Sequence, residues 1–505
     1  MRWRGGGPPT DVGLHEALTR AHEIEELATD NPLETIALNR LLAALTASVF
    51  PELTDESDWF DRWQEGAFDA ARCEAYFAQH TDRFDLLSPT RPFYGHPDTE
   101  AKDPSPITRL FHAAASGNNA ALFSHDLDAE NQPLTLAQAA RALVCTQAAA
   151  LGGGVAKPFN LCHGPLVGGA YFWLRGVADE RPSLFRALLL NLAPDSGVWG
   201  NTEGDHPAWE ADEPPLPKKR DVGGIRELFT FQSRRLQVVL NEEQGVTGVR
   251  YNQGSKVENL LFDDPHLAYL AGNEGLYPLR FSTARALWQG SAAYMMNIEK
   301  KGEGGHAPKT FEWLANNVEE LDLDRRVAFA ADVFGMVNDK AKVELWRQER
   351  VTVYPQIITE EGRWLTLRDI IEDARKIRDF RLREATRAFA TRARLNKPWG
   401  IRLSDVERGE RDAFVQALDT DARYWPVLGQ QFDRILARIA TVPTDDLGAV
   451  RKEWQTMIKK VAKAALHGVL DHYKPSDSAW QALAEAETVL NTGTLYLKSK
   501  KTEPV

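Results

Sequence analysis

Cysteine is scarce in this sequence: Cys73, Cys145 and Cys162 are the three present, and they lie far apart. An odd number of widely spaced cysteines does not fit a framework of disulfide bonds. No uninterrupted apolar stretch is long enough to span a bilayer, and the basic residues 1–9 lack the apolar core of a signal peptide. We therefore expect a cytoplasmic protein in a reducing environment, with no membrane partner.

Positive charge is also in short supply. The sequence has 60 Lys and Arg residues and 72 Asp and Glu residues, which gives a net charge of −12 at pH 7. Proteins that bind nucleic acid unaided are more often basic, because neutralising phosphates supplies most of the non-specific affinity. A nucleic-acid role would therefore depend on a local basic patch, or on partners that carry the positive charge.

Motifs that carry catalysis are missing as well. The segment from Gly302 to Thr310 (GEGGHAPKT) resembles a phosphate-binding loop, but Pro308 stands where a glycine should precede the lysine. No second Cys/His pair lies at zinc spacing from Cys162 and His163, and no G-x-S-x-G nucleophile elbow is present. The sequence predicts no enzyme, no cofactor and no metal. The alternative is a nucleotide-dependent enzyme that uses the 302–310 loop.

The sequence does contain enough apolar material for two or three domain cores. Of its 505 residues, 43% are hydrophobic and 26% are charged, and 14 are tryptophan. Residues 1–358 favour a large mixed N-terminal domain, in which the first predicted helical run covers 14–27. Two antiparallel hairpins are predicted, 235–240 paired with 246–251 and 327–334 paired with 342–353. The predicted fold class is α+β, with hairpins rather than βαβ units.

Residues 363–505 favour helices only. The clearest segment, 450–469, keeps one apolar stripe over almost its whole length. Long helices with short joins predict a C-terminal four-helix bundle. Two of its helices carry basic stripes, formed by Lys452, Lys459 and Lys463 and by Arg383 and Arg387. Such stripes are solvated faces or, if both face the same way, a phosphate-tracking surface.

Three further features are open to more than one interpretation. The stretch from Gly152 to Gly169 (GGGVAKPFNLCHGPLVGG) follows a predicted helix for which Thr135 is a plausible N-cap. Glycine lets another backbone or a ligand approach closely, so the stretch is either a tight connection or a contact surface. Lys256 follows a glycine bend, and the tip of the second hairpin, 338–341, is polar. A plain surface turn is the alternative for both.

Several segments, taken in their order along the chain, resemble one known family. They are GLHEALTRAHEIEEL, ALGGGVAKPFNLCHG followed by FWLRG, PAWEAD, YNQGSK and NDKAKVELWRQERV. Together with the helical C-terminal part they cover essentially the whole chain. The sequence resembles the large subunit (CasA) of type I-E CRISPR Cascade, the RNA-guided DNA surveillance complex of bacteria.

The resemblance implies a non-catalytic subunit that recognises a protospacer-adjacent motif in target DNA from the minor groove. Base pairing with the guide then reads the remaining sequence. Glycines of the loop would bring the backbone to the base edges, a lysine would contact bases and phosphates, and a hairpin wedge would start strand separation. By this resemblance the motif-binding residues are Gly152, Gly153, Gly154, Lys256, Asn338, Asp339, Lys340 and Ala341.

The resemblance also implies partners. A loop containing Phe123, Ser124, His125 and Gln132 would dock against the 5′ end of the guide RNA and a neighbouring subunit. The helical bundle would contact small Cascade subunits and the displaced strand, which would give the basic stripes a use. The family also recruits the helicase-nuclease that degrades the target in antiviral defence. A scaffold subunit that never touches DNA is the further alternative.

The chain departs from the family pattern in three places. Members open with an apolar strand containing Trp-Ile-Pro, which is not found here, so the first edge of the N-terminal domain is expected to differ. Some members carry a cysteine cluster before the lysine-bearing strand, but 240–248 contains no cysteine, and we predict no zinc. Lys340 stands in the wedge where a glutamine is expected, a change that can alter which motifs are tolerated.

Overall fold

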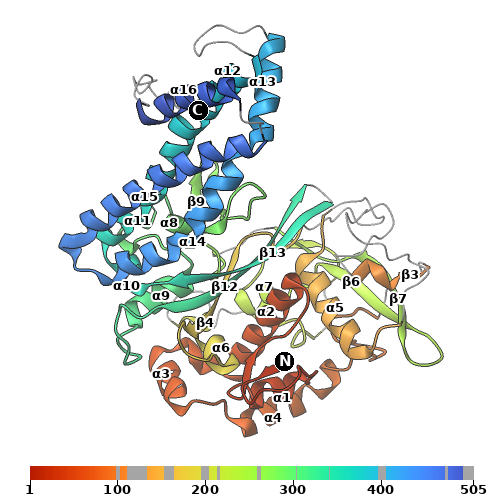
Figure 1. The fold of residues 1–505 in the computed structure, drawn as a ribbon. Coiled ribbons are helices and arrows are strands. Elements are labelled where there is room, and N and C mark those ends of the chain that lie inside the picture. Colours follow the sequence, from red (N-terminus) through yellow and green to blue (C-terminus); the bar gives the residue numbers. More distant parts are fainter. Residues whose placement is uncertain are drawn as a thin grey trace. The chain divides into compact units, whose positions relative to one another are not determined.

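The computed structural model describes residues 1–97, 103–110, 133–152, 164–194, 204–212, 216–258, 263–302, 304–339, 342–395, 405–472 and 476–492. It is a mixed helix and sheet protein with small, mainly antiparallel sheets (Figure 1). The chain divides into two compact units, one formed by Met1–Leu287 and Ala293–Thr359 and the other by Trp288–Ala292 and Glu360–Val505. None of the described helices is long and apolar enough to cross a membrane.

Helices of the N-terminal unit surround a buried central helix, α2, which contacts α5, α6 and α7. The Asn31 side chain caps α2 by accepting a hydrogen bond from the Leu33 amide, and Pro32 occupies the first helical position. The bounds are α1 (Leu14–Thr19), α2 (Pro32–Val49), α3 (Glu56–Glu65), α4 (Ala70–Gln79), α5 (Leu136–Ala149), α6 (Leu184–Leu192), α7 (Ile225–Phe229), α9 (Lys309–Asn317) and α10 (Pro355–Thr359). A short helix, α8 (Ser291–Tyr294), lies where the chain returns from the C-terminal unit.

The strands of the N-terminal unit form several small sheets. Their orders are β13-β12-β4, β3-β7-β6, β10-β9-β11 and β1-β2, all antiparallel, and β5-β8, which is parallel. The bounds are β1 (Arg2–Trp3), β2 (Ile24–Glu26), β3 (Ser105–Pro106), β4 (Tyr171–Val177), β5 (Lys219–Arg220), β6 (Arg234–Leu240), β7 (Val246–Gln253), β8 (Lys256–Val257), β9 (Tyr269–Gly272), β10 (Gly275–Pro278), β11 (Gly305–His306), β12 (Phe329–Asp339) and β13 (Lys342–Val353). Both predicted hairpins, β6–β7 and β12–β13, are confirmed.

The predicted helical run 14–27 is wrong in its second half. Helix α1 ends at Thr19, and β2 pairs with β1, in which Trp3 is the partner of Ile24. The Arg2 guanidinium forms an ion pair with Glu26 at 2.5 Å across the same two strands. Ile24 is fully buried as a strand residue, so tertiary pairing decides its conformation and overrides the helical spacing.

The described part of the C-terminal unit after Glu360 is helical, but the predicted bundle of four continuous helices is not confirmed. A π-helical turn, Arg378–Leu382, separates the first two helices, and Asp419 interrupts the next segment with a positive φ of 41°. Helices α11, α14 and α15 contact one another, while α12 contacts α13 and α16. The bounds are α11 (Glu361–Ile377), α12 (Arg383–Leu395), α13 (Asp405–Leu418), α14 (Thr420–Thr441), α15 (Leu447–His467) and α16 (Asp477–Thr492).

A short segment from earlier in the chain, Trp288–Ala292, completes the core of the C-terminal unit. The Trp288 ring lies 4.9 Å from the ring of Phe432 and 6.4 Å from that of Trp454, centroid to centroid. The Trp364 indole donates a hydrogen bond of 2.9 Å to the Ala292 carbonyl. Aromatic rings at these separations contribute packing beyond their buried area, so the segment is part of this core.

An ion-pair network joins α11 to α15 and predicts acid sensitivity. Burial alone would raise the pKa of Asp373, but hydrogen bonds from Arg451 and Gln455 outweigh burial and lower it. A lowered carboxyl pKa adds stability above about pH 4 that is lost as the pH falls through the folded-state pKa. We expect Asp373→Asn to reduce the free energy of unfolding by about 1–3 kcal/mol at pH 7. Chemical unfolding of both proteins at pH 7 and pH 3 measures this, and the difference should shrink at pH 3.

The matched control for this prediction is Asp412→Asn. Asp412 pairs with its neighbour Arg411, and its side chain is 52% exposed. Exposed pairs contribute little, so this variant should unfold like the parent protein at both pH values. An Asp373→Asn variant whose stability deficit is unchanged at pH 3 would contradict the assignment of a charge-dependent contact.

Candidate nucleic-acid interface

The glycine stretch starts at the C-terminal end of α5, whose residues are set in place by buried polar contacts. As predicted, Thr135 caps α5, in a capping box with Gln138. Near the other end, the buried Gln147 side chain accepts a hydrogen bond of 2.8 Å from the Arg234 amide and donates one of 2.8 Å to the Arg234 carbonyl. The Ser233 hydroxyl donates to the Gln147 carbonyl at 2.7 Å. The last turn of α5 is therefore fastened to the first residue of β6.

The Arg234 side chain extends this connection to the start of the glycine stretch. Its guanidinium donates hydrogen bonds to the carbonyls of Ala150 at 3.3 Å and Leu151 at 3.0 Å, and to the Tyr251 hydroxyl at 3.1 Å. Arg234 is only 4% exposed, so these bonds form in a protein interior where they are strong. The carbonyls just before Gly152 are thereby held against both strands of the β6–β7 hairpin.

The glycine stretch returns to the same helix end. The amides of Leu166 and Val167 donate hydrogen bonds of 2.8 and 3.2 Å to the Ala148 carbonyl. The Tyr171 hydroxyl, from β4, lies 2.9 Å from the Leu166 carbonyl. The described residues at both ends of the stretch are thus held at the C-terminal end of α5. Of the predicted glycine probe, Gly152 is half-buried, while Gly153 and Gly154 lie outside the described residues.

The last glycine of the stretch, Gly169, serves close packing. A Cβ on Gly169 would lie 2.7 Å from the side chain of Leu267, and a Cβ on Gly335 would lie 2.5 Å from the Gly169 carbonyl oxygen. Gly335 is the residue of β12 that follows the last pair with β4, Phe334 with Tyr171. At this position the stretch is therefore a tight connection, and it joins the base of the β12–β13 hairpin.

The bend before Lys256 is enforced by the backbone beside it. A Cβ on Gly254 would lie 2.6 Å from three backbone atoms, the Arg234 nitrogen, the Gln232 oxygen and the Ser233 carbonyl carbon. Only glycine fits so close an approach. The Gly254 amide donates to the Ser233 carbonyl at 3.1 Å, and Lys256 follows in β8. Lys256 is half-exposed, and its side chain forms no hydrogen bond or ion pair with a described residue.

One residue therefore links two of the predicted DNA-reading elements. Arg234 holds the Leu151 carbonyl through its side chain, and its backbone nitrogen abuts Gly254, two residues before Lys256. Sequence reasoning missed Arg234, because a buried arginine at the start of a strand leaves no pattern in the sequence.

The β12–β13 hairpin, the predicted wedge, extends beyond its pairing with β4. Strand β4 pairs with β12 only as far as Phe334, while β12 and β13 remain paired up to Asp339 and Lys342. The final part of the hairpin, from Gly335, is a ribbon of two strands, with an irregularity between Val337 and Asn338 (Figure 1). Asn338 is half-exposed on this ribbon. Lys340 and Ala341 lie outside the described residues.

The other predicted contact residues are scattered or lie outside the described residues. Phe123, Ser124, His125 and Gln132 belong to the second group. On α15, Lys452, Lys459 and Lys463 are exposed, and Lys463 pairs with Glu487 at 3.5 Å. On α12, Arg383 is exposed, and Arg387 pairs with Glu384 at 2.6 Å. Both helices contact α16, but no contact between the two stripes joins them into one surface in the described residues, so a single phosphate-tracking face stays a prediction.

The 302–310 segment has the wrong geometry for a phosphate loop. β11 pairs antiparallel with β9, and the His306 ring lies 2.9 Å from the Asp263 carboxylate. Thr310 is fully buried and its hydroxyl donates to the Pro265 carbonyl at 3.4 Å, so it is not free to hold a metal ion. These contacts argue against the nucleotide-dependent alternative.

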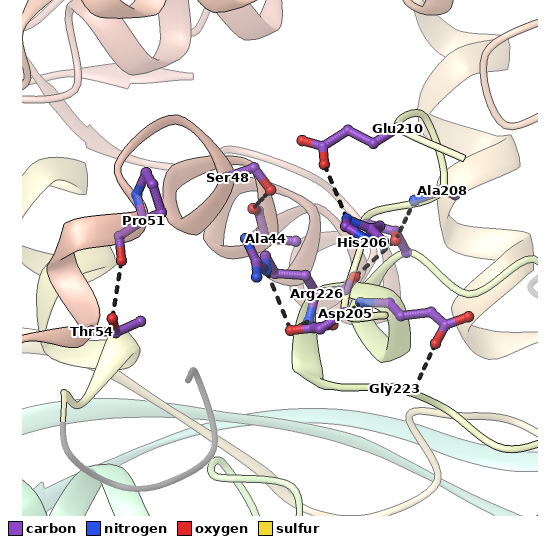
Figure 2. A network of polar contacts seen from close by, with 12 residues as sticks. Ala44, Ser48, Pro51, Thr54, Asp205, His206, Ala208, Glu210, Gly223 and Arg226 are labelled. Carbon is purple, nitrogen blue, oxygen red and sulfur yellow. Dashed lines mark hydrogen bonds and ion pairs between the residues drawn. The ribbon is translucent and has the colours of Figure 1, made fainter. Parts of the chain in front are cut away.

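The PAWEAD segment, residues 207–212, is hydrogen-bonded to α4 through Tyr76. The Trp209 indole donates to the Tyr76 hydroxyl at 2.7 Å, and that hydroxyl donates to the Glu210 carboxylate at 2.5 Å. Just before this segment, the fully buried Asp205 accepts hydrogen bonds from the amides of Glu227 at 2.9 Å and Arg226 at 3.3 Å. Figure 2 shows Asp205 beneath Arg226, with Ala208 and Gly223 in the same network. Asp205 thereby holds the start of α7, the helix that follows β5.

These features define a mixed α+β protein whose candidate interface is built from backbone, glycine and lysine. Among the described residues no group of three or more His, Cys, Asp or Glu side chains could hold a metal ion. The family sequence model for CRISPR-associated protein Cse1 matches residues 1–465, and the chain belongs to this family.

Individual relatives agree with this assignment. A CRISPR-associated protein CasA/Cse1 from Thermus thermophilus is 30% identical over 494 residues, which cover 92% of this chain and 91% of the relative. The solved structure of Thermus thermophilus CasA (Cse1) has a TM-score of 0.78 at 25% identity and covers 96% of this chain and 95% of that one. A chain of a CRISPR RNA-guided surveillance complex shares the fold, with a TM-score of 0.72 at 20% identity and 97% coverage of both chains.

Proposed function

We propose that this protein is the non-catalytic large subunit of a type I-E CRISPR surveillance complex, and that it recognises the protospacer-adjacent motif of target DNA from the minor groove. Membership of the Cse1 family and the fold shared with a surveillance-complex chain support this proposal. The observation that carries it is the Arg234 clamp, the set of hydrogen bonds that fastens the carbonyls preceding Gly152 to β6 and β7, while the Arg234 backbone lies against Gly254 in the bend that leads from β7 to Lys256. The glycine backbone and the lysine then act on one ligand.

The chemistry of these groups suits the minor groove. That groove shows a degenerate pattern of acceptors, so an element that reads it tolerates several related motifs. Gly152, Gly153 and Gly154 have no side chains, and their backbone can approach the base edges closely. Lys256 supplies a cation that contacts base acceptors and phosphates, and no described carboxylate neutralises it.

The β12–β13 ribbon would act as the wedge. Asn338, Asp339, Lys340 and Ala341 at its tip would insert beside the motif and unstack one base step, which costs a few kcal/mol. Pairing between the guide RNA and the opened strand offsets that cost. Because the ribbon extends beyond β4, it reaches the duplex without displacing the sheet.

The other predicted contact residues would bind the guide RNA and further protein subunits. The loop with Phe123, Ser124, His125 and Gln132 would dock against the guide RNA end and a neighbouring Cascade subunit. The exposed lysines of α15 and Arg383 of α12 would face small subunits and the displaced DNA strand. The assembled complex would then recruit the helicase-nuclease.

Lys256→Ala tests the proposed motif reading. In the assembled complex, we expect this substitution to raise the Kd for a motif-bearing duplex about tenfold, because one base and phosphate contact contributes roughly 1–3 kcal/mol. Discrimination between duplexes with and without the motif should fall as well. Equilibrium binding at fixed salt measures both quantities.

Lys301→Ala is the matched control, since it removes the same charge from a lysine that pairs with Glu312 at 2.8 Å. Its complex should bind DNA like the parent. A Lys256→Ala complex with unchanged affinity and unchanged discrimination would favour a scaffold subunit without DNA contact.

A further inference from the structure

The parallel pair β5–β8 brings two further lysines beside Lys256. Lys219 is the register partner of Lys256, and the Lys256 amide donates to the Lys218 carbonyl at 3.0 Å. Register partners in adjacent strands point to the same face of a sheet, so the Lys219 and Lys256 side chains share one face. Arg220, next along β5, lies over the Phe231 ring at 4.6 Å and pairs with Glu227.

The charges of the three lysines are not neutralised by described residues. Lys218 and Lys219 are exposed, and neither side chain forms an ion pair or hydrogen bond with a described residue. Like charges on neighbouring strands destabilise a sheet. Glu258, which follows β8 directly, forms no ion pair with any of the three lysines in the described part of the chain. An anionic ligand would relieve the repulsion.

Side-chain contacts next to both strands hold the β5–β8 pair in place. The Glu227 side chain pairs with Arg220 and accepts a hydrogen bond of 2.6 Å from the Gly223 amide, while Asp205 holds the first turn of α7 (Figure 2). On the other strand, the Ser255 hydroxyl donates to the Leu216 carbonyl at 3.0 Å. Few conformational states are lost when a preorganised surface of this kind binds its ligand.

We propose that Lys218, Lys219 and Lys256 form one lysine ridge that binds the phosphate backbone of double-stranded DNA next to the adjacent motif. This inference rests on the proposed function and adds a division of labour to it. Lys256 reads the motif, while Lys218 and Lys219 contribute affinity that is independent of sequence, because phosphate contacts position a protein without reading bases. The ridge would also supply a local basic patch on a chain whose net charge is −12.

The test is the double variant Lys218→Ala/Lys219→Ala in the assembled complex, with duplexes that carry or lack the motif and a salt titration of each. We expect the Kd to rise about tenfold for both duplexes while their ratio stays unchanged. The slope of log Kd against log salt should fall by about 1.8, since each lost phosphate contact removes about 0.9. The Lys218→Arg/Lys219→Arg variant keeps the charge and should restore affinity and slope.

The outcomes separate the two proposals. Unchanged affinity and slope in the double variant, with Lys256→Ala still defective, overturns the ridge and leaves the proposed function standing. If none of the lysine variants affects DNA binding, both proposals fail. Loss of guide RNA from the purified complex, with normal DNA affinity in the complexes that keep it, overturns the ridge as well, because the lysines then contact RNA. Thermal unfolding of each variant confirms that it is folded.

Discussion

Replacing Gly254 with alanine is expected to weaken binding to a motif-bearing duplex about 30-fold, although no charge is removed. The added Cβ would lie 2.6 Å from backbone atoms of Gln232, Ser233 and Arg234. Backbone cannot move aside as a flexible side chain can, so the bend must open and carry Lys256 away from its position. A 30-fold change corresponds to about 2 kcal/mol of binding free energy. Binding titrations of the assembled complex measure it.

Gly13→Ala provides the control for this substitution. A Cβ on Gly13 would meet nothing within 4 Å, and its φ of −70° suits any residue. This variant should bind and unfold like the parent. If Gly254→Ala bound the motif normally while Lys256→Ala did not, the lysine would act without the bend, and the proposed geometry would be wrong.

Replacing Arg234 with methionine is expected to lower the free energy of unfolding by about 3 kcal/mol or more. The substitution keeps much of the buried volume but removes the donors to the Ala150, Leu151 and Ser233 carbonyls and to the Tyr251 hydroxyl. Buried acceptors left without partners cost roughly 1–3 kcal/mol each. Chemical unfolding measures the loss. Motif binding should weaken in parallel, because the glycine stretch is no longer fastened to the strands before Lys256.

Arg181→Met is the control: it makes the same substitution at an arginine that has no buried hydrogen-bond network. Arg181 pairs with Glu25 at 2.7 Å, but its side chain is 52% exposed, so the change should stay within about 0.5 kcal/mol. An Arg234→Met variant of full stability would contradict the clamp. If the variant were destabilised but discriminated the motif normally, Arg234 would contribute to stability and not to motif recognition.

Local patterns in the sequence were sufficient to predict part of this architecture. Hairpins β6–β7 and β12–β13 join neighbouring segments, so alternation and turn residues identify both strands and their partner. The capping box at Thr135 and Gln138 is equally local. The helical run 14–27 failed because pairing between Ile24 and Trp3 depends on the tertiary structure.

The rest depends on contacts between residues that are far apart in the chain. Lys219 and Lys256 pair across strands of two residues each, too short for any periodicity to show. Arg234 donates a hydrogen bond to the Leu151 carbonyl, 83 residues earlier in the chain, and no sequence pattern around either residue predicts this contact. At Asp419 the apolar spacing continues through a residue with positive φ, so two helices have the periodicity of one.

Because Trp288–Ala292 packs with the helices after Glu360, the C-terminal unit is not encoded by one continuous segment of the chain. The chain passes between the two units at three points, after Leu287, after Ala292 and after Thr359. A recombination event at residue 360 would therefore transfer the C-terminal helices without the Trp288 indole that packs against Phe432. A chimaera of this protein would keep the complete core of the C-terminal unit only if Trp288–Ala292 were exchanged together with the helices after Glu360.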